Sequence, residues 1–399
     1  MALAGLLPDS QYVINLHADR YLYLRAFCAA LVAGQCTLMP PNRQPYTLEQ
    51  LRAAYDDAYT VGEAGEEAVQ PDFRAEVPDI PDLQPAAIAF TSGSTGAPTP
   101  NLKYWQTLRD GALSNAQMLL NEDSEQLNAV ATVPPQHMWG METSIMLPLF
   151  AKVAISNLTP FYPQDISDAL QSVPEPRVLI SSPIHLDAFL TSGVTTGRID
   201  KIITATAPLS KQLALDLEAH FDTLVQDIFG CSESGILATR RTAIDEEWTY
   251  STTFELTMVQ GGVKISAAHL SEDVMLPDIV ELAGPNSFRW MGRQQDMVNI
   301  AGKRGSLAEL NFRLQEIPGV VDGVIFAPTG EQRRGYRLAA LVVAPDLDVS
   351  DILDALKHKV EPVFLPRPIL RVPNLPRQGT GKLAIKAVQE MFARLRDAT

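Results

Sequence analysis

Short apolar runs alternate with segments of helical length through the first half of the chain. The runs predict strands at Tyr12–Leu16, Ala86–Thr91, Ala129–Val133, Val153–Ser156, Val178–Ser181, Lys201–Thr206 and Thr223–Ile228. The stretches between them predict helices at Asp19–Ala33, Gln106–Leu120 and Ser210–His220, the last with Ser210 as its N-cap. Alternation of this kind predicts an α/β fold in which a large N-terminal domain carries mostly parallel sheets with flanking helices.

The pattern changes after Phe288–Gly292. The elements predicted beyond it are a strand, a helix, a hairpin-like pair of strands and a second helix, at Met297–Ile300, Ser306–Gln315, Val320–Ala327 with Arg337–Val343, and Val349–Val360. Together they indicate a compact α+β unit of ordinary domain size. We therefore predict a large domain over residues 1–295 and a small, mobile C-terminal domain over residues 296–399.

The distribution of charge supports this division. The whole chain has a formal net charge of −15. Residues 296–399 hold 15 basic and 12 acidic side chains, a net charge of +3, whereas residues 1–295 hold 17 basic and 35 acidic ones, a net charge of −18. A chain this acidic is a poor candidate for non-specific nucleic-acid binding, so we expect no nucleic-acid partner.

Composition narrows the class of protein further. The chain has 399 residues and is 46% hydrophobic, enough to bury a large core, yet no apolar run is long enough to span a membrane. No basic stretch followed by an apolar core opens the chain, so no signal peptide is predicted. Three cysteines without zinc spacing indicate a reducing compartment, and we expect the protein to be cytoplasmic.

A loop rich in glycine and hydroxyl side chains follows the strand predicted at Ala86–Thr91. It contains Thr91, Ser92, Gly93, Ser94, Thr95 and Gly96. Glycines permit the positive-φ turns that align successive backbone N–H groups, and such groups bind phosphate oxygens. The loop alone would also suit an ordinary surface turn, and what favours phosphate binding is the order of the segments that follow it.

Those segments are His137 within Pro134–Gly140, Ala205–Leu209, Asp227–Glu233, Asp278, Gly292–Asp296, Gly302–Arg304 and Gly379–Lys382. In this order they resemble the signature motifs of the adenylate-forming superfamily, which comprises acyl-CoA synthetases, adenylation domains and luciferases. The resemblance covers roughly three quarters of the chain. The Gly381–Lys382 pair does not belong to a Walker loop, because Pro376 and Leu383 stand where that motif requires glycine and Ser/Thr. The segment Gly230–Ser234 is not a hydrolase nucleophile elbow, because Ser234 stands where that motif requires its second glycine.

The resemblance implies a role for each matching residue. Glu233 would hold Mg²⁺, and Lys382 would be a mobile charge between the substrate carboxylate and the α-phosphate of ATP. His137 would line the acid pocket and, with Lys382 and Glu233, belong to the catalytic set. The pocket would also include Trp139 and Ile184. The remaining nucleotide-binding residues would be the phosphate loop with Ala205, Thr206, Ala207, Asp227, Phe229, Gly230, Ser232, Asp278, Arg293 and Arg304.

The implied reaction is a two-step ligation with ATP and Mg²⁺. A carboxylic acid would become acyl-AMP with release of pyrophosphate, and the acyl group would pass to a phosphopantetheine thiol of an acyl carrier protein or of coenzyme A. Because nucleophile and electrophile are both anionic, catalysis depends on positioning and charge neutralisation. Between the steps, the small domain would rotate near Gln295 and bring the Met297–Arg304 face toward the pantetheine arm.

Some positions depart from the family pattern. Thr99–Pro100 follows Pro98 where the family has a lysine, and Lys103 is the next residue that could supply that charge. The hinge position is Gln295, and the N-terminal part is short, as in acyl-AMP ligases of the aryl-polyene type. Alternatives also stay open: Lys382 as a surface lysine, His137 as a core residue, Asp278 as a turn cap, and a degenerate homologue that binds nucleotide without turnover.

Overall fold

The computed structural model describes residues 3–62, 77–92, 98–120, 126–293, 297–300, 303–328, 337–377 and 383–397. The chain forms two compact units. The first comprises Met1–Thr257, Lys264–Val274 and Gly284–Ser287; the second comprises Met258–Val263, Met275–Ala283 and Phe288–Thr399. The predicted α/β class is confirmed, and the second unit takes in two segments that precede residue 295.

A five-stranded sheet forms one part of the first unit, in the order β3 (Tyr59–Val61), β1 (Tyr12–Asn15), β2 (Cys36–Met39), β4 (Pro85–Ser92) and β5 (Pro98–Tyr104). The first four strands are parallel, and β5 runs antiparallel to β4. Helix α1 (Arg20–Val32) begins where the Asp19 side chain accepts a hydrogen bond from the Leu22 amide, as an N-cap does. Helix α2 (Pro45–Ala54) follows β2.

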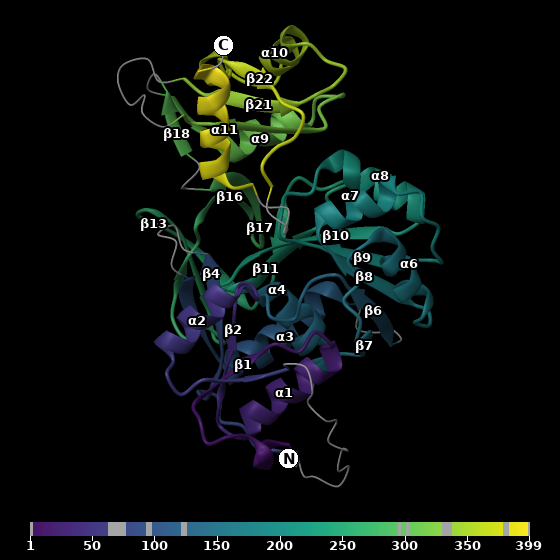
Figure 1. Ribbon diagram of the computed structural model, residues 1–399, viewed down its shortest axis with the longest axis vertical. Coiled ribbons are helices and arrows are strands. Elements are labelled where there is room, and N and C mark those ends of the chain that lie inside the picture. The colour runs from purple at the N-terminus through teal and green to yellow at the C-terminus, as the bar shows by residue number, and fades with distance from the viewer. Residues whose placement is uncertain are drawn as a thin grey trace. The chain divides into compact units, whose positions relative to one another are not determined.

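The other large sheet of this unit runs in the order β12 (Trp248–Tyr250), β11 (Gly235–Arg240), β10 (Leu224–Cys231), β9 (Lys201–Thr204), β8 (Arg177–Ser181), β6 (Leu127–Ala131) and β7 (Val153–Ile155). Strands β10 to β7 are parallel, whereas β10, β11 and β12 pair antiparallel. Both faces are apolar, as expected of a covered parallel sheet. Helices α6 (Pro163–Gln171), α7 (Pro183–Thr191) and α8 (Lys211–Phe221) lie beside this sheet (Figure 1). They pack on it through aliphatic side chains and Phe189.

Helix α3 (Trp105–Leu119) and a second, interrupted helical segment lie between the two sheets' cores. The interrupted segment is α4 (Met138–Met141), a π-helical turn (Glu142–Met146) and α5 (Leu147–Phe150). Its start approaches the preceding chain so closely that a Cβ on Gly140 would overlap the carbonyl oxygen of Pro134. Met141 and Ile145 are fully buried against Phe27 of α1.

The second unit contains β16 (Asp278–Gly284), which neighbours β17 (Ser287–Arg293), and the hairpin of β18 (Met297–Ile300) and β19 (Lys303–Ser306). A further sheet pairs β20 (Asp322–Phe326) antiparallel to β21 (Ala339–Val343), with β22 (Ile369–Arg371) parallel to β21. Its helices are α9 (Leu307–Gln315), α10 (Val349–Lys357) and α11 (Ile385–Asp397). Within the described residues, β13 (Phe254–Val259), β14 (Gly262–Ala267) and β15 (Val274–Met275) form a separate three-stranded sheet.

Several predicted boundaries differ from the structure by one to three residues, and two strand ends do so for local reasons. The strand predicted at Lys201–Thr206 ends at Thr204, because Thr206 has φ 80°, which a strand cannot contain. The strand predicted to end at Ile228 runs to Cys231, because β11 pairs with its last residues. The predicted N-cap Ser210 is confirmed, since its hydroxyl oxygen accepts a hydrogen bond from the Leu213 amide.

Candidate active site

The predicted site residues of the first unit lie just beyond the carboxyl ends of neighbouring parallel strands. His137 and Trp139 follow β6, Ile184 follows β8, and the segment Ala205–Ala207 follows β9. Phe229–Glu233 is the end of β10 and the turn after it. The strand order is β6, β8, β9, β10, so these segments succeed one another along one edge of the sheet. Ligands of open α/β sheets bind at this edge.

The turn predicted to flank adenine has an unusual backbone. Thr206 lies in the left-handed region, with φ 80°. This conformation is strained for a β-branched residue and costs on the order of 1–3 kcal/mol. Thr206 and Ala207 are exposed, whereas Ala205 is buried. A strained, exposed turn at the carboxyl end of a strand is typical of a binding site.

Asp227 and Phe229 belong to a cluster at the junction of β10 and β11. The buried Asp227 carboxylate accepts hydrogen bonds from Thr242 Oγ1 at 3.0 Å and from Arg240 Nη2 at 3.3 Å. Burial raises the pKa of Asp227 to about 6, and the Arg240 charge offsets part of that shift. The Phe229 ring lies 5.3 Å from the ring of Trp248, over which Arg240 stacks at 4.2 Å. The adenine contacts of Asp227 and Phe229 stay predictions.

The predicted metal ligand, Glu233, lies exposed in the tight turn that joins β10 to β11. The ammonium of Lys103 approaches this turn from the buried side and donates a 2.7 Å hydrogen bond to the backbone carbonyl oxygen of Glu233. The carboxylate of Glu142 also supports the turn, because its Oε1 accepts from the Ile236 amide at 3.0 Å. Contacts from the protein interior therefore hold the backbone of the turn, while the Glu233 side chain is exposed to solvent.

Lys103 and Glu142 are both buried, with 2% and 8% of their surface exposed. Burial lowers the pKa of Lys103 and raises the pKa of Glu142 to about 7, and each charge offsets the other's shift. A cavity of about 10 Å³ lies beside them, with Asn115 and His269 also in its wall. The charge of Lys103, which the sequence offered as a substitute for a phosphate-loop lysine, is thus directed at the Glu233 turn.

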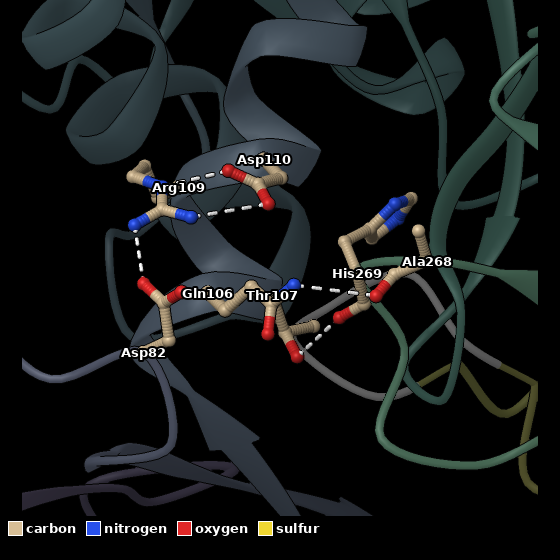
Figure 2. A network of polar contacts seen from close by, with 7 residues as sticks. All are labelled: Asp82, Gln106, Thr107, Arg109, Asp110, Ala268 and His269. Carbon is tan, nitrogen blue, oxygen red and sulfur yellow. Dashed lines mark hydrogen bonds and ion pairs between the residues drawn. The ribbon is translucent and has the colours of Figure 1, made fainter.

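Helix α3 fixes the segment that carries His269 (Figure 2). Thr107 Oγ1 donates to the carbonyl oxygen of His269 at 2.7 Å, and Gln106 Nε2 donates to that of Ala268 at 3.3 Å. On the same helix Arg109 forms ion pairs with Asp82 and Asp110. Of these residues, Thr107 and His269 line the cavity beside Lys103.

The residues predicted for the acid pocket follow β6 and β8. The half-buried His137 is the N-cap of α4, and its carbonyl oxygen accepts from the Met141 amide at 2.7 Å. Trp139 is buried, and its Nε1 has no hydrogen-bond partner among the described residues. Ile184, in the first turn of α7, is 44% exposed. The chain leading to His137 is anchored by the buried Arg20, which donates to the carbonyl oxygens of Ala131 and Val133.

The remaining predicted residues lie in the second unit or outside the described part of the chain. Asp278 is buried in the second unit and accepts a 2.8 Å hydrogen bond from Trp290 Nε1. It borders a cavity of about 220 Å³ whose other lining residues are Met258, Gly261, Gly262, Val263, Ile279 and Val280. Thr91, Ser92, Arg293 and Arg304 are placed by backbone only, at the ends of β4 and β17 and within β19. Gly93–Gly96, Gln295 and Lys382 lie outside the described residues.

None of the helices in the described part of the chain is long and apolar enough to cross a membrane. Within the same residues, no group of three or more His, Cys, Asp or Glu side chains gathers as a metal site would. Burial raises the pKa of Cys231 to about 11, so this thiol, two residues before Glu233, is a poor nucleophile.

Comparison with known proteins places the chain in a family. The family described as AMP-binding enzyme matches residues 26–269, and the chain belongs to it and so to the adenylate-forming superfamily. Similar proteins include a 3,4-dihydroxybenzoate–[aryl-carrier protein] ligase of Bacillus anthracis, 19% identical over 77% of this chain and 74% of that protein. A 4-coumarate–CoA ligase of Rhodobacter capsulatus is 27% identical over 59% of this chain and 58% of that protein.

Solved structures of the superfamily share the fold. ATP-bound MatB from Rhodopseudomonas palustris has a TM-score of 0.78 at 17% identity, covering 98% of this chain and 91% of that one. The anthranilate CoA ligase AuaEII in complex with anthranoyl-AMP has a TM-score of 0.76 at 17% identity, covering 100% of this chain and 89% of that one. The predicted family and fold are therefore confirmed.

Proposed function

We propose that this protein activates a carboxylic acid with ATP and then transfers the acyl group to a phosphopantetheine thiol of an acyl carrier protein. In the first step a carboxylate oxygen bonds to the α-phosphorus of ATP, the bond from that phosphorus to the bridging oxygen breaks, and pyrophosphate leaves. In the second step the thiol sulfur bonds to the acyl carbon, AMP leaves and the thiol proton is released. Membership of the AMP-binding enzyme family supports the reaction class.

The observation that carries the proposal is the order of segments along one sheet edge. The acid-pocket residues His137 and Trp139 follow β6, the adenine turn follows β9, and Glu233 follows β10. Acid, nucleotide and metal would then be bound side by side, as joining a carboxylate to a nucleotide requires. Ile184 at the start of α7 would border the same acid pocket.

The residues around Glu233 fit a magnesium ion bound together with ATP. Mg²⁺ is commonly held by one or two carboxylates plus phosphate oxygens rather than by a cage of protein ligands. The exposed Glu233 carboxylate on an anchored turn provides one such ligand. When bound, the ion neutralises phosphate charge, which lowers the repulsion between the two anionic reactants.

Lys382 is proposed as the mobile charge of the first step. An ammonium between the substrate carboxylate and the α-phosphate would stabilise the charge that develops there. The Gly379–Lys382 motif supports this role. The hinge at Gln295 and the second-step role of the Met297–Arg304 face are part of the same proposal.

The thiol acceptor is the finer part of the proposal. A carrier protein is supported by the name of the B. anthracis relative, and free coenzyme A is the alternative supported by the R. capsulatus relative. An acidic carrier would dock on basic residues of the C-terminal part such as Arg333 and Arg334. Reversing both charges should slow transfer to a holo-carrier and leave transfer to coenzyme A unchanged. Equal carrier transfer by the reversed variant would remove the docking surface from the proposal.

The test of the first step is ATP–pyrophosphate exchange with a panel of aromatic and medium-chain acids. Exchange that depends on one class of acid supports the proposal. A second candidate, a homologue that binds nucleotide without turnover, is favoured by Thr99–Pro100 in place of the family's lysine. Calorimetric nucleotide binding without exchange for any acid would establish that second candidate instead.

A further inference from the structure

The turn that carries Glu233 is held by two buried charged side chains from distant parts of the chain. Lys103 reaches it from β5 and donates to the Glu233 carbonyl oxygen at 2.7 Å. Glu142 reaches it from the π-helical turn and accepts from the Ile236 amide at 3.0 Å. Gly235, between these contacts, has φ 74°, and a Cβ there would overlap Glu142 Oε1. The turn and the carboxylate therefore fit together only with glycine at this position.

These contacts are not explained by stability. Two ions lose their hydration when buried, and well-packed apolar side chains of similar size would often serve the fold as well. The polar atoms of both residues instead meet backbone groups of one short turn. Loss of either hydrogen bond would leave a buried polar group without a partner, which is costly. The two bonds therefore hold the turn in one position at Glu233 and at Ile236.

The positions of the two residues connect three parts of the proposed site. Lys103 lies on β5 opposite Ala87 of β4, and the opposite end of β4 leads into the predicted phosphate loop. The π-helical turn directly continues α4, which carries Trp139 and has His137 as its N-cap. Insertions of this kind in a helix are frequent at functional sites, because they change which side chains face inward.

We propose that Lys103 and Glu142 are positioning residues that set the Glu233 turn relative to the phosphate loop and the acid pocket, so that the Glu233 carboxylate meets the metal of Mg·ATP. The proposal rests on the proposed function and adds to it a role for two residues outside the family motifs. Lys103 is thus not directed at the phosphates in place of the lysine missing at Thr99; it acts through the backbone of the proposed metal ligand.

The test is a set of matched variants. Lys103→Met removes the hydrogen bond to Glu233, and Glu142→Leu removes the one to Ile236. Each should raise the Mg²⁺ concentration that gives half-maximal ATP–pyrophosphate exchange by about tenfold, the effect of one lost charge-assisted hydrogen bond. The KM for the acid should change less than about twofold, since no acid contact is altered. Glu142→Gln keeps an acceptor oxygen for Ile236 and should restore most of the metal response.

Lys201→Met is the matched control. Lys201 is half-buried on β9, and its ammonium also donates to a backbone carbonyl oxygen, that of Leu119. Its loss should cost comparable stability without changing the Mg²⁺ requirement. If Lys103→Met does not fold, the Lys103→Met/Glu142→Met double variant replaces it, because it leaves neither charge buried without the other. It should show the same rise in the Mg²⁺ requirement.

A second readout separates this proposal from the proposed function. Binding of Mn²⁺·ATP, followed by the Mn²⁺ electron paramagnetic resonance signal, does not require turnover. Lys103→Met should weaken it about tenfold while binding of ATP in EDTA is unchanged. If the wild type showed no ATP–pyrophosphate exchange, the proposed function would be wrong, but the Mn²⁺·ATP binding test of Lys103 and Glu142 could still be carried out. An unchanged metal response in Lys103→Met, or an equal shift in Lys201→Met, would overturn the positioning role.

Discussion

The carboxylate of Glu142 occupies the space into which a side chain on Gly235 would project. This contact joins the π-helical turn to the start of β11, and Gly235 adopts φ 74°, which glycine tolerates without strain. Two local irregularities, one in a helix and one in a turn, are therefore complementary. Together they hold the turn that carries Glu233.

Gly235→Ala should lower the free energy of unfolding by at least about 2 kcal/mol, because it combines backbone strain with a clash against a buried carboxylate. Gly193→Ala is the matched control, since Gly193 has φ 70° but open space where the Cβ would stand. It should cost only the strain, about 1 kcal/mol. Urea unfolding of both variants measures the difference, and equal losses would show that Glu142 does not occupy the space in solution.

Glu142 should also make stability depend on pH. Its pKa is raised from 4.5 to about 7 in the folded chain, chiefly by burial. The folded state therefore binds the proton more tightly, and the resulting stabilisation is complete below pH 4.5 and is lost as pH rises through 7. Glu142→Gln should flatten this fall. Between pH 5 and pH 8 the wild type should lose about 2.5 kcal/mol more unfolding free energy than the variant; parallel curves would contradict the raised pKa of Glu142.

Lys382→Ala should reduce acyl-AMP formation by at least about a hundredfold, because it removes a charge that acts on the developing transition state. Nucleotide binding should stay within about threefold of the wild type. Lys386→Ala, which removes an exposed lysine from α11, is the control and should leave both unchanged. Single-turnover assays measure the first step, and a Lys382→Ala variant with normal rate would assign that lysine to the surface.

Glu233→Gln should weaken the binding of metal-bound ATP and leave the binding of metal-free ATP unchanged, because only the carboxylate charge is lost. The expected loss is about tenfold or more, the scale of one charged contact. Glu246→Gln, in the exposed segment after β11, serves as the charge-matched control. Calorimetric titrations with and without Mg²⁺ distinguish the two states; equal weakening in both would place Glu233 outside the metal site.

The regular elements were predictable where a local pattern specified them. The helix at α1 has an N-cap aspartate and apolar positions at helical spacing, and its structure matches the prediction within one residue at each end. The strand end at β9 was not predictable, because nothing in the letters Ala205–Thr206 signals a positive φ. Surrounding structure imposes that conformation on the turn.

The candidate site was predictable only as far as its motifs. The placing of Glu233 in a turn after a parallel strand follows from the sequence, because strand and glycine-bounded turn are both local signals. The tertiary contacts of Lys103 do not, since its partner is 130 positions away along the chain. Glu142 carried a usable signal that sequence reasoning missed: it is the one charged residue of the mostly apolar segment Met138–Phe150, and a carboxylate that is buried needs a partner.

The most direct test of the account follows the oxygen atoms of the acid. An acid labelled with ¹⁸O in its carboxyl group is incubated with the enzyme, Mg²⁺ and ATP, with hydroxylamine in place of the thiol. If the carboxylate bonds to the α-phosphorus, mass spectrometry will find AMP that carries one ¹⁸O atom, together with the hydroxamate of the acid. Unlabelled AMP, or ADP with label in inorganic phosphate, would contradict the proposed acyl-adenylate.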